Sequence, residues 1–395
     1  MIYLDSASTT EVRREVIEAM WPFLTGDYGN PSSRHTVGES AANALRAARA
    51  TIAEWLGCRA SEIVFTSGGT ESNNLAIKGI ALATPRGRHI VTTAIEHEAV
   101  LKSVDYLVRH HDFEVSFVDT DQTGLVLPAA LAAALRPDST LATISHANNE
   151  VGTVQPIVAL ARTSHEAGVP FHADAVQSAA WLSVNVNLSN ESDEPEHDDG
   201  VGGVDALSIS GHKLGAPKGI GVLFIRNRIP REPVLHGGGQ ERGTRSGTEN
   251  VAGAVALATA VGLGDNDRVA THDVAKIRDE FIASVLAHVP DSQLTGHPTR
   301  RLPAIASFVF PGTNGEAVLL ELEARGIVSS SGSACAAGSD EPSHVLTELG
   351  YPPDVAQTAV RFSWSKDLSA SDLATVAEAS RASVEAVRGL PMSPS

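Results

Sequence analysis

Residues 62–82, EIVFTSGGTESNNLAIKGIAL, place a short β-rich run directly before a helical pattern. Three of the four residues of the run Glu62–Phe65 are apolar, two of them β-branched, whereas the apolar residues of Glu71–Leu82 recur with the spacing of an amphipathic helix. A strand followed at once by a helix is the repeating unit of layered α/β proteins. This stretch therefore predicts an α/β sheet whose functional loops follow the strand ends.

The same alternation continues to about residue 226. The seven predicted strands are Glu62–Phe65, His89–Thr93, Glu114–Val118, Leu141–Ser145, Pro170–Ala173, Ala206–Ile209 and Gly221–Ile225. Helical patterns lie between most of them, at Glu71–Leu82, Glu98–Arg109, Pro128–Arg136 and Ile157–Glu166. This order predicts a mainly parallel sheet in a large domain.

The pattern changes after about residue 264. A longer helical stretch, Val269–His288, precedes a strand at Ile305–Phe310 and a helix near Gly315–Arg325. A strand near Val360–Trp364 and a final helix follow. This second part of the chain predicts a smaller α+β domain.

Composition narrows the classes of function. The 395 residues carry 30 Lys and Arg against 47 Asp and Glu, and the resulting net charge of −17 repels nucleic-acid phosphates and anionic lipid. Direct binding of nucleic acid is therefore not expected. No apolar run reaches the roughly 20 residues of a membrane span. Because Met1–Thr10 also lacks the features of a secretory signal, a cytoplasmic location is expected.

The chain has two cysteines, Cys58 and Cys335, and no C-x-x-C or Cys/His ligand spacing. Neither a disulfide framework nor a metal site is expected, although a lone cysteine can still be a nucleophile. The acidic run Glu191–Gly200 (ESDEPEHDDG) favours a solvated surface loop over a cation site, because its only nitrogen ligand is His197.

The segment Thr66–Asn74 (TSGGTESNN) lies between a predicted strand and a predicted helix, with Thr70 in the N-cap position. Backbone N–H groups and the helix dipole at such a turn can bind an anion. Neither G-x-G-x-x-G nor G-x-x-x-x-G-K-[ST] is present, so a dinucleotide or triphosphate loop is not supported. The residues alone leave a phosphate cradle and a plain capped turn both open.

The segment Ser208–Gly221 (SISGHKLGAPKGIG) presents His212 and Lys213 directly after a strand. Four of the six lysines lie in helical or tail contexts, where a solvated amine is expected. A lysine that forms a covalent bond to a carbonyl cofactor needs an amine of lowered pKa, and Lys213 beside Lys218 and His212 suits this role best. A surface lysine remains the alternative.

In His172–Gln177 (HADAVQ), Asp174 follows an apolar strand. A buried aspartate can keep the ring nitrogen of pyridoxal 5′-phosphate (PLP) protonated, and Gln177 is a candidate for the ring hydroxyl. A helix cap or a buried ion pair would explain Asp174 equally well.

Five further segments point to one family. They are GNPSSRH (29–35), EHEAV (96–100), NNEVGTVQP (148–156), GGGQERGTRSGTENV (237–251) and SSGSACAAGSDEPSHVL (330–346). With the clusters above, they resemble the cysteine desulfurases of the NifS/IscS type. The last segment resembles the long catalytic-cysteine loop of the first desulfurase group rather than the short R-x-G-x-x-C form of the second. The similarity runs from Tyr3 to about Trp364.

The resemblance implies a PLP-dependent homodimer of fold type I, with a large domain at residues 13–260 and a small domain at 1–12 and 261–395. Lys213 would hold PLP covalently, His97 would stack on the ring, and Asp174 would pair with the ring nitrogen. The other implied cofactor contacts are Gly69, Thr70, Asn149, Gln177, Ser210, His212 and, from the other subunit, Thr248. Arg361 would bind the substrate carboxylate as a bidentate fork, and Asn149 would contact the ring hydroxyl or the bound substrate.

The implied reaction takes sulfur from L-cysteine, holds it as a persulfide on Cys335 and releases alanine. The persulfide would pass to an acceptor protein in iron–sulfur cluster assembly or tRNA thiolation. Three features depart from the family pattern: the acidic run from Glu191, the sequence RFSWSKD at 361–367, and the tail EAVRGLPMSPS, in which no scaffold-docking extension is recognisable. Selenocysteine lysis, transamination and cysteine-sulfinate cleavage remain as alternatives, of which Cys335 argues against transamination. A catalytically silent docking role is the other alternative, and Lys213 together with Cys335 argues against it. Cys58 follows a helix-ending pattern and is expected to be a small buried apolar residue.

Overall fold

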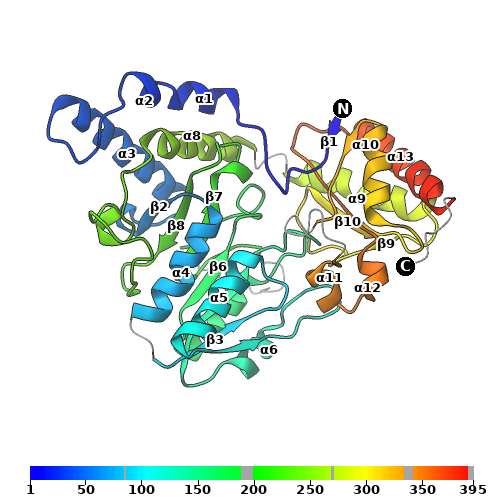
Figure 1. Cartoon of the computed structure of the whole chain (residues 1–395), viewed down its shortest axis with the longest axis horizontal. Helices are drawn as coiled ribbons and strands as arrows, with labels where there is room; N and C mark the ends of the chain where they lie inside the picture. Colours follow the sequence, from blue (N-terminus) through cyan, green and yellow to red (C-terminus); the bar gives the residue numbers. More distant parts are fainter. Residues whose placement is uncertain (84–85, 188–198, 268–270, 333–340, 390–395) are drawn as a thin grey trace.

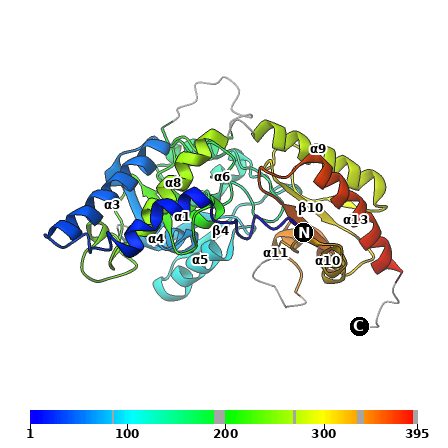
Figure 2. The same cartoon turned by 90° about the horizontal axis from the view of Figure 1, so that it is seen from above.

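The computed structural model describes residues 1–83, 86–187, 199–267, 271–332 and 341–389. Two lobes lie side by side (Figures 1 and 2). The first lobe contains a large sheet with helices on both faces, and the second contains the small strands together with the last helices of the chain. The N-terminal strand lies in the second lobe, and the chain then crosses to the first lobe, where α1 (Arg14–Met20) begins.

The sheet of the first lobe has the strand order β2-β8-β7-β6-β5-β3-β4. Its strands are β2 (Ile63–Thr66), β3 (His89–Thr92), β4 (Glu114–Phe117), β5 (Ser139–Ser145), β6 (Phe171–Asp174), β7 (Ala206–Ser210) and β8 (Gly221–Ile225). β8 is antiparallel to both of its neighbours, and the other pairs are parallel. The predicted seven-stranded, mainly parallel sheet is therefore confirmed.

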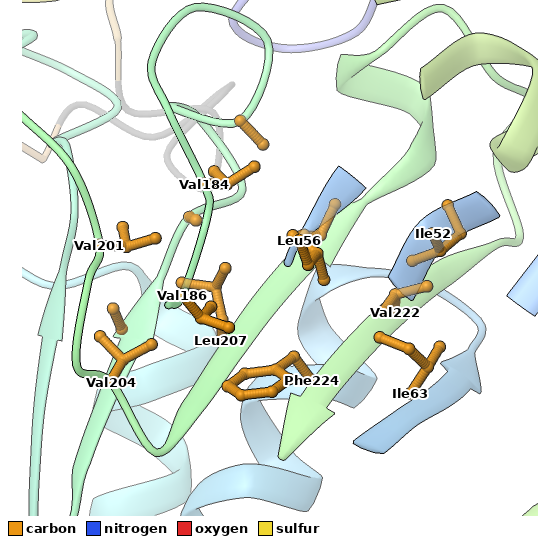
Figure 3. Packing of buried hydrophobic residues seen from close by; sticks show 14 of the residues in the cluster. Ile52, Leu56, Ile63, Val184, Val186, Val201, Val204, Leu207, Val222 and Phe224 are labelled. Carbon is orange, nitrogen blue, oxygen red and sulfur yellow. The ribbon is translucent and has the colours of Figure 1, made fainter. Parts of the chain in front are cut away.

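Alternate residues of each strand face opposite layers of the core. In β2, Ile63 and Phe65 belong to one apolar cluster, whereas Val64 belongs to the cluster on the other face. In β8, Val222 and Phe224 lie on the first of these faces, where Figure 3 shows them packed with Leu56 and Ile52. Because both of their faces are buried, β2 and β8 read as nearly continuous apolar runs, and this is why they could be located from the sequence.

Helices cover both faces of the sheet. One face is covered by α4 (Gly69–Ala83) and α5 (Glu98–His111). The other face is covered by α3 (Thr36–Trp55), α6 (Pro128–Ala134), α7 (Ile157–Glu166) and α8 (Val251–Asp267). The short helix α2 (Pro22–Thr25) follows α1 and lies near α8.

The predicted helix Pro128–Arg136 is two residues too long. The helix ends at Ala134 because Leu135 is extended, with φ −71° and ψ 136°. Arg136 precedes Pro137, and the residue before a proline disfavours the helical conformation. A breaker directly after the helical pattern thus moved the end of the helix.

The second lobe is built on a three-stranded antiparallel sheet with the order β12-β10-β9. Its elements are β9 (Gln293–Leu294), β10 (Ile305–Val309), β12 (Ala359–Ser363), α9 (Thr271–His288), α10 (Gly315–Ala324), α11 (His344–Glu348), α12 (Pro353–Ala356) and α13 (Ala370–Arg388). Phe281 of α9 meets Phe308, Phe362 and Trp364 edge to face at 5.4–6.0 Å between ring centroids. This aromatic cluster gives the second lobe a core of its own.

A parallel pair of two-residue strands, β1 (Ile2–Tyr3) and β11 (Ile327–Val328), joins the start of the chain to the second lobe. The division into domains at residues 13–260 and at 1–12 with 261–395 stays a prediction. Within the described ranges, no helix combines the length and the apolar character that crossing a membrane requires.

Candidate functional site

The strand ends bring the predicted residues to one edge of the large sheet. Gly69 follows β2, His97 follows β3, Asn149 follows β5, Asp174 ends β6 and Lys213 follows β7 in the 3₁₀ turn η3 (Gly211–Lys213). These five strands all run in the same direction, because only β8 is reversed among the strands around them. Ligands in such sheets bind beyond the carboxyl ends of the strands. We call this group of residues the sheet edge.

Asp174 is buried without a cationic hydrogen-bond partner among the described residues. Its carboxylate accepts from the Asn73 Nδ2 at 2.6 Å and from the Val176 backbone N–H at 2.9 Å, and both donors are neutral. Burial raises the pKa of Asp174, although the nearby positive charges of His97 and Lys213 oppose the shift. An ionised carboxylate in this position would be stabilised by a further cation.

Lys213 points its amine at the N-terminal segment. The Nζ donates to the backbone carbonyl oxygen of Ser8 at 2.7 Å and to that of Ala7. Burial lowers the pKa of Lys213 to about 8, with a further contribution from Arg361. The amide of Gln177 donates to the same Ala7 carbonyl at 2.9 Å, so Gln177 and Lys213 converge on one atom.

Gly69 forms the tight turn into α4. A Cβ at this position would lie 2.5 Å from the Val176 Cγ2 and 3.4 Å from the Ser210 Cβ, so a larger residue would not fit. The first backbone N–H groups of a helix have no acceptor within the helix, and they attract anions. Thr70 is exposed in the same first turn, and Ser210 is buried beside it at the end of β7. Because α4 begins at Gly69, Thr70 lies inside the first turn and is not the predicted N-cap residue. The phosphate cradle stays a prediction.

His212 is anchored on the N-terminal segment. Its Nδ1 lies 3.2 Å from the Thr9 hydroxyl, and its backbone carbonyl accepts from the Thr10 N–H at 3.0 Å. Burial, together with the charges of Lys213 and Lys218, lowers the pKa of His212 to about 4. The ring is therefore neutral at physiological pH, and any contact that it makes with an anion is a neutral hydrogen bond.

His97 is the N-cap of α5. Its Nδ1 accepts from the Ala99 N–H at 3.0 Å, which leaves the Nε2 to carry the proton of the neutral ring. The side chain is exposed in the single chain, at the open side of the sheet edge. Thr248 is also exposed, in the loop before α8. The expected contact of Thr248 with the cofactor of the other subunit stays a prediction.

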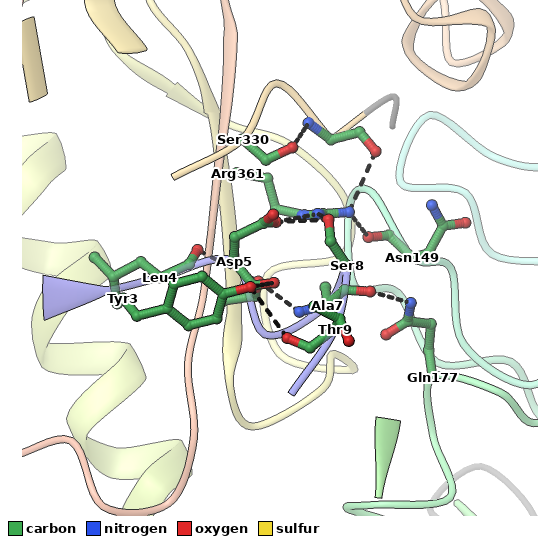
Figure 4. A network of polar contacts seen from close by, with 12 residues as sticks. Tyr3, Leu4, Asp5, Ala7, Ser8, Thr9, Asn149, Gln177, Ser330 and Arg361 are labelled. Carbon is green, nitrogen blue, oxygen red and sulfur yellow. Dashed lines mark hydrogen bonds and ion pairs between the residues drawn. The ribbon is translucent and has the colours of Figure 1, made fainter. Parts of the chain in front are cut away.

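Arg361 of β12 is the most completely buried cation of the site, at 1% exposure. Its Nη1 donates to the carbonyl oxygens of Asn149 at 2.8 Å and Gly332 at 3.2 Å. Its Nη2 donates to the Asp5 Oδ1 at 2.8 Å and to the Ser8 Oγ at 3.0 Å (Figure 4). The Nε is buried and has no hydrogen-bond partner among the described residues. We call Arg361, Asp5 and Ser8 the arginine corner.

Sequence reasoning missed the acidic residues that surround these groups. Asp5 pairs with Arg361, and Glu150 accepts from the Ser343 hydroxyl at 2.5 Å and faces the charges of His344 and Arg361. Glu96 is buried behind His97. The available signal was adjacency, since Glu96 and Glu150 directly follow or precede predicted site residues in the chain.

Of the two cysteines, Cys58 lies within the described residues. Cys335 lies outside the described residues, as does residue range 191–198 of the acidic run. Cys58 is partly buried and packs against the apolar core, and burial together with Glu62 raises the pKa of its thiol to about 12. A thiol with such a pKa is a poor nucleophile at neutral pH. Among the described residues, no group of His, Cys, Asp or Glu side chains could hold a metal ion.

A cavity of about 680 Å³ lies beside the sheet edge. Residues of both lobes line it, among them Ala7, Gln177, Lys213 and Trp364. Its volume is in the range of small-molecule sites. Asp174 is not among its described lining residues, so the cavity adjoins the sheet edge from the side of the N-terminal segment.

Comparison with known proteins gives consistent results. The aminotransferase class-V family model matches residues 2–376. A protein named cysteine desulfurase IscS from Methanosarcina thermophila is 41% identical over 396 residues, which cover 100% of this chain and 94% of the relative. Another of that name, from Dictyoglomus turgidum, is 42% identical over 94% of this chain and 91% of its own.

Solved structures resemble the whole chain as well. A structure described as a NifS-like protein has a TM-score of 0.87 and 33% identity, with 97% of this chain and 99% of the other covered. A structure described as SspA in complex with cysteine has a TM-score of 0.77 and 36% identity, with 92% and 98% covered.

Proposed function

The chain belongs to the aminotransferase class-V family and is a cysteine desulfurase, and from this premise we propose how its own residues carry out the reaction. L-cysteine loses its sulfur, L-alanine is released, and the sulfur is held as a persulfide on Cys335. The observation that carries the proposal is that Lys213 and Arg361 meet at Ser8: the Lys213 Nζ donates to the Ser8 carbonyl oxygen at 2.7 Å, and the Arg361 Nη2 donates to the Ser8 hydroxyl at 3.0 Å. Asp174 ends β6, which pairs with the strand that precedes Lys213.

The residues of the sheet edge fit PLP. The Asp174 carboxylate, with only neutral hydrogen-bond donors, suits a protonated pyridine nitrogen, and the Gly69 turn at the start of α4 suits a phosphate group. Lys213 would hold the cofactor covalently, and His97 would stack on its ring. When bound, PLP supplies an electron sink for the substrate carbon atoms next to the amine.

The remaining cofactor contacts are proposals from the same geometry. Phosphate would be held by Thr70, Ser210 and His212, with Thr248 of the partner subunit in a homodimer. Asn149 and Gln177 would contact the ring hydroxyl or the bound substrate. The convergence of Gln177 and Lys213 on one carbonyl oxygen supports the assignment of Gln177.

Arg361 would bind the substrate carboxylate through one donor rather than as the bidentate fork that the resemblance implies, because its Nη1 and Nη2 already have four acceptors. Its buried Nε, without a partner among the described residues, is a donor that an anion would satisfy. The backbone carbonyl of Asn149 accepts from the same guanidinium, so the Asn149 side chain would lie close to the bound substrate. This donor selects amino acids over simple amines.

Lys213 and His97 would move protons. Because the pKa of Lys213 is lowered to about 8, a sizeable fraction of this amine is uncharged near pH 8 and can accept a proton. The Nε2 of His97 faces away from the helix that its Nδ1 caps, and it can exchange a proton with the substrate. Two proton carriers suit the reaction, because the Cα proton of the substrate is removed and later returned to Cα, and Cβ gains one proton, equivalent to the one that the Cys335 thiol loses, to become the methyl group of alanine.

The thiolate of Cys335 would take the sulfur. It attacks the substrate sulfur, a new S–S bond forms, and the C–S bond breaks with its electron pair going to the substrate carbon, which is then protonated. Cys58 does not suit this role, because burial holds its thiol protonated.

The substrate and partners follow from the family. A solved relative is described in complex with cysteine, which supports L-cysteine as the substrate. The persulfide would be passed to an acceptor protein of iron–sulfur cluster assembly or of tRNA thiolation, and the enzyme would act as a cytoplasmic homodimer. The net charge of −17 disfavours direct contact with tRNA and supports transfer through a protein.

Replacing each cysteine in turn tests the proposal. Cys335→Ala should still bind PLP and L-cysteine, as followed by absorbance, and yet form neither alanine nor persulfide. Cys58→Ala is the matched control and should retain alanine release near the wild-type rate. If Cys335→Ala kept most of its conversion of cysteine to alanine, the mechanism would be wrong and another PLP reaction would have to be sought.

A further inference from the structure

The N-terminal segment is held to the second lobe by its backbone. β1 pairs with β11, and the Ser6 N–H donates to the Ser363 carbonyl oxygen at 3.0 Å. The Ala7 N–H donates to the Ser363 hydroxyl at 2.9 Å. Ser363 lies two residues after Arg361 on β12, so the position of this segment is fixed relative to the arginine.

The same segment is held to the first lobe a few residues later. The Thr10 N–H and hydroxyl both donate to the His212 carbonyl oxygen, at 3.0 and 2.8 Å. The Arg13 N–H donates to the Gly215 carbonyl oxygen at 3.1 Å. Between the two attachments, the carbonyl oxygens of Ala7 and Ser8 accept from Lys213. The segment therefore connects the lysine of one lobe with the arginine of the other.

Asp5 lies where this segment meets Arg361. Its Oδ1 accepts from the Arg361 Nη2 at 2.8 Å and from the Ser8 hydroxyl at 2.7 Å, and the Ser8 oxygen also accepts from Nη2 (Figure 4). The backbone of Asp5 forms a bridge with Ser363, and its carbonyl oxygen accepts from the Tyr3 hydroxyl at 3.1 Å. Side chain and backbone are thus both fixed, and Asp5 cannot leave Arg361 without losing several hydrogen bonds.

Four of the five N–H donors of the Arg361 guanidinium have acceptors among the described residues. An arginine has five N–H donors, four of them on Nη1 and Nη2. These two atoms already have four acceptors, which are Asn149, Gly332, Asp5 and Ser8. Nε is left without a partner among the described residues, and the longest of the four contacts is that from Nη1 to Gly332, at 3.2 Å.

We propose that Asp5 is a positioning residue that fixes the Arg361 guanidinium so that its Nε faces the substrate carboxylate, and that it thereby sets the preference for amino acids over amines. The proposal rests on the proposed function, because it takes Arg361 as the group that receives the substrate. Asp5 has a second effect, which is to balance a cation that is almost fully buried. An arginine at this depth without a carboxylate partner would tend to turn away from the site or to draw in water.

A pair of ligands that differ only in the carboxylate tests the proposal. L-alanine is the reaction product, and ethylamine is the same molecule without its carboxylate. Binding of each to the PLP-loaded enzyme is measured by absorbance titration in wild type, Asp5→Asn and Asp5→Ala. The dissociation constant of L-alanine should rise by about 10-fold to 100-fold in Asp5→Ala and by less in Asp5→Asn, which keeps an acceptor oxygen. That of ethylamine should change less than about threefold.

Two outcomes would overturn the proposal. Tighter binding of L-alanine in Asp5→Asn would show that Asp5 competes with the substrate for the arginine, and equal weakening of both ligands would show a merely structural role. The control is Asp105→Asn, which removes an exposed aspartate–arginine pair with Arg109. Wild-type turnover of L-cysteine tests the proposed function separately: an inactive wild type contradicts the function, whereas an active wild type with unaffected Asp5 variants contradicts this inference alone. With L-cysteine, the KM of the Asp5 variants should rise more than kcat falls.

Discussion

The buried charged groups of the sheet edge and of the arginine corner differ in whether they have an ion-pair partner. Within the described part of the chain, the Asp174 carboxylate at the sheet edge accepts only from neutral donors, and the Lys213 amine donates only to backbone carbonyls. Burial shifts both pKa values toward the uncharged forms, upward for Asp174 and downward for Lys213. At the arginine corner, by contrast, Arg361 and Asp5 form a direct ion pair at 2.8 Å.

This difference in ion pairing indicates which kind of ligand each region would bind. A carboxylate and an amine that lack ionic partners gain most from a ligand that brings its own charges, and PLP carries a cationic ring nitrogen and a reactive carbonyl carbon. A preformed ion pair has little to gain from a large charged ligand. It presents one remaining donor in a fixed direction, which suits the small carboxylate of a substrate that must enter and leave.

The largest effect is expected for the amine of the sheet edge. Lys213→Ala should lower alanine formation by at least about 10⁴-fold, since it removes both the covalent attachment of the cofactor and a proton carrier. Mass spectrometry after borohydride reduction should find PLP attached to Lys213 in wild type and to no residue of the variant. Lys218→Ala, an exposed neighbour five residues away, is the matched control. A variant that retained a reducible link to PLP would refute the assignment of Lys213.

A smaller effect is expected for the carboxylate of the same region. Asp174→Asn should lower kcat by roughly 10²-fold to 10³-fold, because the ring nitrogen would lose the charge that keeps it protonated. Without cofactor, the variant should be more heat-stable than wild type at pH 8, and this advantage should shrink as the pH falls. The sign follows from the raised folded pKa of Asp174: the stability that its protonated form contributes is lost as the pH rises. An unchanged kcat would contradict the charge argument.

Two members of the sheet edge, Lys213 and Asp174, could be placed from local sequence, whereas the roles of His97 and Asn149 came from the family resemblance. Lys213 and Asp174 lie at or within three residues of the end of an apolar strand, and parallel strands deliver their ends to one side without further information. The strand bounds were less exact at polar ends. β5 begins at Ser139 rather than Leu141, because the Ser139 hydroxyl bonds to the His89 ring inside the sheet, and a polar residue gives no apolar signal.

The arginine corner could not be predicted in the same way. Asp5 and Arg361 are 356 positions apart, and they meet because the two-residue strands β1 and β11 pair and because the backbone of Asp5 and Ser6 pairs with Ser363 of β12. Strands of that length are too short for a periodic pattern. The role of Arg361 came from the family resemblance, and its contact with Asp5 came from the structure alone.

Glu96 is a further buried carboxylate near Asp174. Its carboxylate accepts from the Ser145 N–H at 3.0 Å and from the Thr93 hydroxyl at 2.8 Å, so it links the ends of β3 and β5 just before His97. Burial raises the pKa of Glu96 to about 8, and the charge of Asp174 adds to the shift. Like Asp174, it is a sheet-edge carboxylate without a cationic hydrogen-bond partner among the described residues, but it lies behind the site.

The smallest expected effect is therefore on stability rather than on chemistry. The folded pKa of Glu96, about 8, is above its ordinary value of 4.5, so the stability that this group contributes is present below about pH 4.5 and is lost as the pH rises toward 8. Glu96→Gln removes the ionisation, and the thermal midpoint of the variant should gain on that of wild type between pH 5 and pH 8, by the equivalent of up to a few kcal/mol. Calorimetry at several pH values, with Glu18→Gln as an exposed control, measures the difference. A constant difference across this range would mean that Glu96 stays ionised in the folded protein. A buried carboxylate next to the sheet edge would then carry its charge without the ion-pair partner that Arg361 has in Asp5.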